Sequence, residues 1–263
     1  MTRVLFALGL ALALVGCGEK GAEAPADSGP ATSIEYGAMP QHVGKRVTVV
    51  GWVLGAGESF HVEDSEANQS FYFVLVDNPE VDWEAFFKDY EDTEKLVQSL
   101  QEGERSGSSS SREVREFSRL QDAFHAWRGL ILGQEARSDV TTWARFSDNP
   151  IGAMFDATPG GPLVLVRPTR EELASAAERL MDEYRSIERS AEVRATGLLT
   201  RTNSAESGER RAKNLDEALQ KKPFLLLVEH YEILRTARDM LTKAPTVGAD
   251  ELVDPGQVGG GGR

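Results

Sequence analysis

The chain has 263 residues and a formal net charge of −13, with 42 acidic side chains against 29 basic ones. Such an acidic surface repels phosphate backbones, which disfavours nucleic acid as the main partner. Cys17 is the single cysteine, so disulfides within the chain and sites built from several cysteines are excluded.

The N-terminus carries the pattern of an exported protein. Arg3 is followed by an almost purely apolar stretch from Val4 to Val15. This stretch has the length of a signal-peptide core and is too short for a permanent membrane helix. It ends in the residues Leu14-Val15-Gly16-Cys17.

These four residues resemble the lipobox of bacterial lipoproteins. The resemblance implies that residues 1–16 are a signal peptide and that Cys17 carries the lipid anchor, with acyl chains such as palmitate. It implies a lipoprotein of the cell envelope that is attached to the membrane. Gly18 stands where an aspartate would retain a Gram-negative lipoprotein at the inner membrane, so the outer membrane, facing the periplasm, is favoured for such a source.

Composition divides the mature chain into three parts. Residues 17–35 are rich in Gly, Ala, Pro, Glu and Ser and predict a flexible tether. Residues 36–245 contain the folded domain. Residues 246–263 are polar, end in four glycines and one arginine, and predict a disordered tail.

The folded region begins with β-rich sequence. Residues 70–77 alternate Phe71, Phe73 and Leu75 with Tyr72, Val74 and Val76, which predicts a strand with both faces covered. The other segments that predict strands are 44–54, 59–64, 162–167, 192–201 and 224–234.

Two of these strands share an internal glycine. Gly51 and Gly197 follow a valine at the same offset. A glycine inside a strand weakens it unless the chain bends or bulges there, as small closed barrels require. With this strand pattern, the chain resembles the OB-fold, in particular the families similar to the anticodon-binding OB module. Another small barrel or an α+β sheet remains an alternative.

Between the strands the sequence turns helical. Residues 82–101 carry an apolar stripe. A helix over 110–132 opens with the capping-box pair Ser110 and Glu113 and stops at Gly133. Thr169 and Glu172 open a third helix, which runs to residue 190. We therefore expect an α+β protein: a small OB-like β-barrel with a helical hairpin inserted at about 80–160, where 143–161 form a long irregular loop.

Few side chains suggest a metal or catalytic site. His61 and Glu63 share one face of a predicted strand and could offer two ligands to a divalent metal, but a third ligand is not evident. An exposed polar strand face is the simpler interpretation. We therefore predict no metal site, no cofactor and no catalytic residues.

Aromatic residues on the expected barrel strands are candidates for binding. Trp52, Phe60 and Tyr72, with His61 and Glu63, occupy the surface that OB-folds use to stack bases or sugars. Packing in the barrel core is the competing interpretation of the same pattern.

The sequence favours a non-catalytic binding or assembly module. Its expected partners are the membrane, through the lipid, and another envelope protein or an extended ligand laid across the barrel. Two alternatives stay open: an envelope hydrolase with carboxylates between barrel and insertion, and an oligonucleotide-binding OB protein.

Overall fold

The structure is a computed structural model that describes residues 29–65, 68–102, 108–137, 141–152, 168–202 and 219–241. The predicted signal peptide, most of the tether, the strand at 162–167 and the tail at 246–263 lie outside these residues. No helix in the described ranges is long and apolar enough to cross a membrane.

The strands form one sheet that curls back on itself. Its order is β1-β2-β6-β7-β5-β4-β3, and an additional pairing of β2 with β4 makes a partial ring of β2, β6, β7, β5 and β4. The pairs β1–β2 and β5–β7 are parallel and the others are antiparallel. The strands are β1 (Thr32–Ser33), β2 (Arg46–Val53), β3 (Ser59–Ser65), β4 (Asn68–Val76), β5 (Thr142–Phe146), β6 (Ala191–Arg201) and β7 (Phe224–Thr236).

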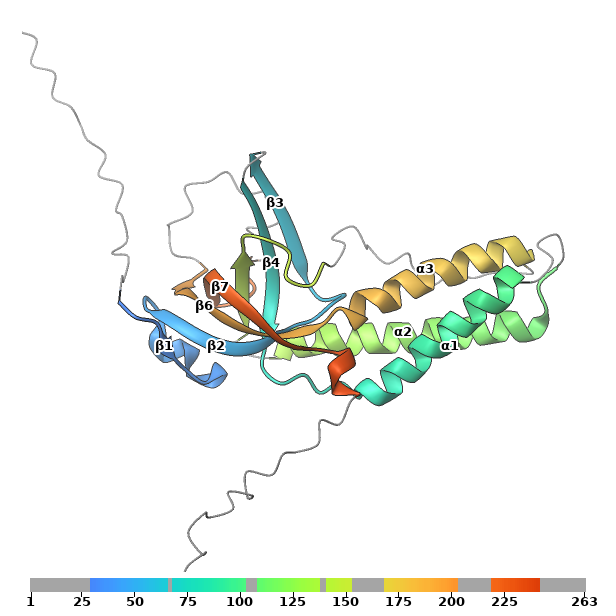
Figure 1. The fold of residues 1–263 in the computed structure, drawn as a ribbon, viewed down its shortest axis with the longest axis horizontal. Coiled ribbons are helices and arrows are strands. Elements are labelled where there is room, and N and C mark those ends of the chain that lie inside the picture. Colours follow the sequence, from blue (N-terminus) through green and yellow to red (C-terminus); the bar gives the residue numbers. More distant parts are fainter. Residues whose placement is uncertain are drawn as a thin grey trace, which may run out of the picture.

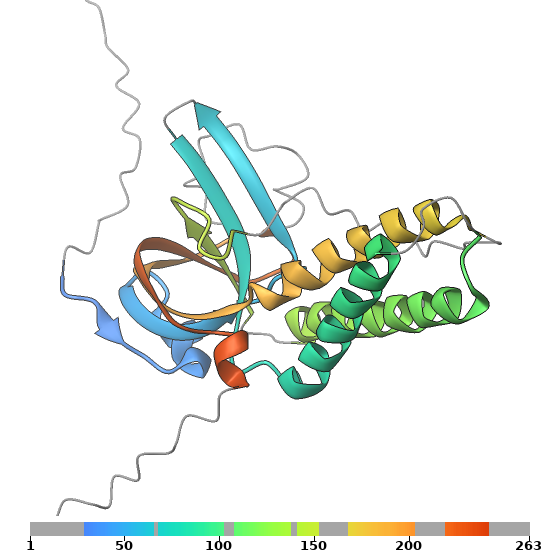
Figure 2. The ribbon, with the colours of Figure 1, turned by 45° about the vertical axis from the view of Figure 1, so that its right-hand side comes forward.

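Three α-helices lie alongside one another and project from one side of the sheet (Figures 1 and 2). They are α1 (Trp83–Glu102), α2 (Ser111–Arg137) and α3 (Arg170–Glu188). Two short 3-10 helices, η1 (Tyr36–His42) and η2 (Arg238–Met240), follow β1 and β7. The mixed α+β content is as predicted from the sequence.

Both predicted capping boxes are confirmed. In α3 the Thr169 hydroxyl accepts from the backbone N–H of Glu172, whose carboxylate accepts from the N–H of Thr169. Ser110 and Glu113 make the same reciprocal bonds, at 2.7 and 3.2 Å, before α2. The predicted stop at Gly133 is wrong, because α2 continues to Arg137.

Two apolar cores lie on opposite faces of the ring strands. Phe73 and Leu75 of β4 point into the ring, where they pack with residues of the other strands such as Val49. Tyr72, Val74 and Val76 point to the opposite face and pack against the helices. The prediction that both faces of this strand are covered is therefore confirmed.

The two internal glycines mark close approaches of backbone. A Cβ on Gly197 would lie 2.0 Å from the Leu227 carbonyl oxygen, and a β-bulge lies between Thr196 and Gly197. A Cβ on Gly51 would lie 2.8 Å from the Val76 carbonyl oxygen, where β2 meets β4 as well as β6. Side chains at these points would push the strands apart.

The predicted irregular loop over 143–161 is wrong in its first part. Thr142–Phe146 form β5, which pairs with β4 on one side and with β7 on the other. This strand also lies inside the range expected for the helical insertion, so the helical part ends at Arg137. Hydrogen bonds to β4 and β7 satisfy the backbone of β5, and a segment of five residues carries too short a pattern to predict this strand.

Candidate functional site

The predicted binding residues do not form one surface. Tyr72 is buried in the core under the helices, and the ring of Phe60 packs 5.5 Å from that of Trp143. His61 stacks on Phe71 with ring centroids 4.6 Å apart. The side chain of Glu63 lies outside the described residues.

Metal ligands do not gather in the described part of the chain. No group there of three or more His, Asp or Glu side chains is placed to hold a metal ion.

Trp52 does line a groove of about 720 Å³, a size typical of ligand pockets. The groove lies where β1, η1 and β2 meet the ends of β4, β6 and β7. Its walls are formed by Ile34, Glu35, Tyr36, Gly37, Val50, Gly51, Trp52, Asp77, Asn78, Glu192 and Arg235.

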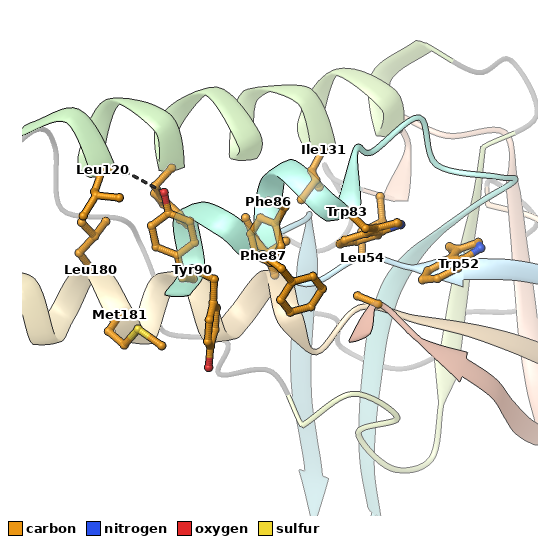
Figure 3. Packing of buried hydrophobic residues seen from close by; sticks show 14 of the residues in the cluster. Trp52, Leu54, Trp83, Phe86, Phe87, Tyr90, Leu120, Ile131, Leu180 and Met181 are labelled. Carbon is orange, nitrogen blue, oxygen red and sulfur yellow. Dashed lines mark hydrogen bonds between the residues drawn. The ribbon is translucent and has the colours of Figure 1, made fainter. Parts of the chain in front are cut away.

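The Trp52 indole is fixed on both sides. Its ring stacks on that of Trp83, with centroids 5.8 Å apart, and the Arg235 guanidinium lies 5.6 Å from its centroid. Trp52 is only 1% exposed, yet its Nε1–H has no acceptor. Figure 3 shows this nitrogen at the end of the ring away from Trp83. A buried donor without a partner costs free energy.

Acidic groups dominate the groove. Arg235 makes two bonds to the Glu192 carboxylate, at 2.7 and 3.2 Å, so this pair is internally neutral. Glu35 and Asp77 are exposed and have no ion pair with any described residue. The groove therefore carries an excess of two negative charges.

Tyr36 anchors one wall of the groove. Its hydroxyl donates to the Leu75 carbonyl oxygen of β4, which ties η1 to the ring. Burial raises the pKa of Tyr36 far above its ordinary value, and the nearby Asp77 adds to this effect. The hydroxyl therefore stays protonated and continues to donate at every physiological pH.

A second cluster of ionisable groups is buried between the ring and the helices. Glu135, near the end of α2, is 2% exposed and accepts a 2.8 Å bond from the Glu58 backbone N–H. Lys222, which is 6% exposed, donates to the Glu135 carbonyl oxygen at 3.1 Å and lies 3.6 Å from the Glu58 carboxylate. Its ammonium also lies over the Trp143 ring.

Burial raises the pKa of Glu135 to about 8, although the bond from the Glu58 backbone and the charge of Lys222 lower it. One carboxylate oxygen of Glu135 has no hydrogen-bond partner. It lies against Gly57, where a Cβ would approach it to 2.1 Å. At neutral pH the carboxyl is therefore mainly protonated, and Gly57 leaves just enough room for it.

Sequence reasoning found Trp52 but missed the charged residues around it. Glu35 lies in the predicted tether, and Asp77 and Arg235 lie at strand ends about 160 positions apart. Glu135 belongs to a helix of mixed charge and Lys222 to a short lysine pair, and both resemble solvated surface. No local pattern marks any of them, because only the ring brings them together.

Comparisons with known proteins give no relatives. No protein-family model, no curated protein and no solved structure matches this chain.

Proposed function

We propose that this chain is a lipid-anchored protein of the bacterial cell envelope that acts as a non-catalytic binding or assembly module. Its partners are the membrane, through lipid on Cys17, and an envelope protein or extended ligand held at the groove. The lipobox-like residues before Cys17 support the anchor. The outer membrane, facing the periplasm, is the favoured location in a Gram-negative source.

We further propose that the partial ring is a small OB-like barrel. The pairing of β2 with β4 and the parallel pairing of β7 with β5 support this assignment. The helical hairpin α1–α2 is then an addition between two barrel strands, and α3 lies before the fourth strand of the barrel.

The observation that carries the binding function is the groove itself, which Trp52 lines and in which Glu35 and Asp77 have no ion pair with any described residue. The sheet and Trp83 hold the Trp52 ring in one orientation, so this wall of the groove is formed before a ligand arrives. Preorganised sites of this kind gain affinity because little is ordered on binding.

Crosslinking from the membrane tests this proposal. A photoreactive residue at Val50, in the groove, is expected to capture a discrete envelope partner in intact cells. The same residue at Glu91, exposed on α1 and outside the groove, serves as the matched control. Cys17→Ser is expected to release the chain from membranes and to abolish lipid labelling. Unchanged membrane partition of C17S, or identical capture from both positions, would contradict the proposal.

The buried carboxyls favour a second candidate function, an envelope hydrolase. Glu58 and Glu135 meet between the ring and the inserted helices, where this alternative expects its acids. Glu135 is almost completely buried, so a substrate reaches it only if the helices move. An activity of the wild type that E135Q loses while retaining its fold would establish this alternative.

The third alternative is an oligonucleotide-binding protein. The excess negative charge of the groove disfavours it, because the groove repels phosphate groups. Binding of single-stranded DNA at low salt, reversed by added salt, would support it.

A further inference from the structure

The groove exposes an unpaired stretch of strand edge. β2 pairs with β6 along its whole length on one side. On the opposite side, β1 reaches only Val47 and Thr48, and β4 reaches only Trp52 and Val53. Between these two neighbours lies Val50, which lines the groove with a side chain 38% exposed.

The direction of the Val50 backbone follows from its neighbours. The Lys45 carbonyl accepts from the Leu199 N–H of β6, at 3.0 Å. The Thr48 carbonyl accepts from the Ile34 N–H on the other side, also at 3.0 Å. Backbone groups of alternate residues face alternate edges of a strand. The N–H and C=O of Val50 therefore face the same edge as those of Thr48, and open toward the groove.

We propose that the groove binds an extended, positively charged peptide segment that adds a short strand to β2 at Val50. The inference rests on the proposed binding function and specifies its ligand. The Val50 N–H and C=O bond the peptide backbone, and Trp52 lines the wall beside it. A lysine or arginine side chain of the peptide faces Glu35 and Asp77. This mode combines main-chain affinity with side-chain specificity.

Charge on the outer face of the ring supports a cationic ligand. Three arginines on this part of the face are already paired with a carboxylate of another strand, at 2.6 to 2.7 Å: Arg46 with Glu229, Arg194 with Glu232, and Arg235 with Glu192. Glu35 and Asp77 are the surplus charges in the groove. A cation placed there neutralises them without competing with a resident basic group.

The open backbone supports a peptide rather than a free amine. A small amine would satisfy the two carboxylates but would make no use of the open Val50 backbone groups. An extended peptide presents carbonyl and N–H groups in the repeat that a strand edge requires.

Nuclear magnetic resonance of the ¹⁵N-labelled, lipidated full chain in detergent micelles tests the inference. The probe is acetyl-Thr-Lys-Val-Lys-Thr-amide, and W52F assigns the Trp52 indole resonance. The lysine peptide is expected to shift this resonance saturably. The same peptide with glutamate in place of lysine is expected to leave it unchanged.

Charge and backbone variants separate the contributions. Glu35→Gln with Asp77→Asn is expected to raise the Kd at least tenfold at low salt. Glu91→Gln with Glu102→Gln, which removes the same charge from exposed positions on α1, is expected to change it less than twofold. Val50→Pro removes the N–H and places a ring carbon at the open edge, breaks no bond to β6, and is expected to raise the Kd at least tenfold, whereas Val50→Ala retains the N–H. Unchanged spectra elsewhere show that each variant is folded.

The outcomes distinguish this inference from the proposed function. Equal binding of the glutamate peptide, or no effect of the E35Q/D77N pair, overturns the cationic ligand while the groove remains a binding site. Capture of a partner from Val50 in cells, with no peptide shifting Trp52, also overturns this ligand class. Failure of both experiments overturns the binding function itself.

Discussion

A single carboxyl decides how the interior of this protein responds to pH. Glu135 lies beside Lys222 and Glu58 where α2 meets the ring, and burial raises its pKa to about 8. In the unfolded chain the same carboxyl titrates near 4.5. The folded state therefore holds a proton that the unfolded chain releases over the interval between these values.

This difference predicts a stability that falls as pH rises. Because the folded state binds more protons, the free energy of unfolding decreases from about pH 4.5 to about pH 8. Glu135→Gln removes the ionisation and is expected to flatten this decrease by on the order of 3 kcal/mol. Urea unfolding of both proteins at pH 5 and pH 8 measures the difference. Parallel pH profiles would mean that Glu135 is ionised in the folded state.

The same residue scale separates Trp52 from the other aromatic candidates. The sequence places Trp52 and Tyr72 on strands, and each packs in the core under the helices. What distinguishes Trp52 is that it also lines the groove and that its buried N–H has no partner. Residue type and strand position could not show this difference, because it depends on which atoms surround each ring.

At the scale of elements, the sequence predicts a feature correctly where the hydrogen-bond partners are close together along the chain. The capping boxes before α2 and α3 are closed by residues three positions apart, so sequence alone predicts them. β5 was missed because its stability comes from β4 and β7, which are distant in the sequence. The predicted end of α2 is wrong because Gly133 does not interrupt the helix, which continues to Arg137.

The capping box of α3 makes a prediction at this scale. Thr169→Ala removes the acceptor for the Glu172 N–H and is expected to lower the free energy of unfolding by about 1 kcal/mol. Ser175→Ala, at an exposed position on the same helix, is the control and is expected to change it by less than about 0.5 kcal/mol. Chemical denaturation measures both, and equal values for the two variants would remove the cap as the cause.

At the scale of the whole molecule, the helices and the ring share one core. Figure 3 shows Trp52 and Leu54 of the β2 region beside Trp83 and Phe86 of α1. Phe86 also contacts the ring of Tyr184 in α3, at 5.7 Å between centroids. The hairpin α1–α2 thus covers one face of the sheet and the apolar side of α3, and the three helices stabilise one another.

Removing the hairpin is therefore expected to unfold more than the hairpin. Replacing residues 83–137 by a short Gly-Ser linker uncovers the outer face of β4 and the apolar side of α3. Exposure of several large apolar side chains costs on the order of 2 kcal/mol each, which exceeds the stability of most domains. We expect loss of cooperative unfolding in circular dichroism. A cooperative transition with an intact β signal would instead establish the ring as an independent unit.

The sequence by itself determined the features that depend on neighbours along the chain: the helices, two of their caps, most strands, the covered faces of β4 and the bulge at Gly197. The tertiary structure alone decided the groove, the open edge at Val50 and the buried Glu135–Lys222 cluster. Each of these joins residues from strands or helices far apart in sequence, and only the closure of β2 against both β4 and β6 fixes their distances. The periodicity of apolar residues does not predict that closure. It shows which face of a helix or strand is buried, but not which other element packs beside it.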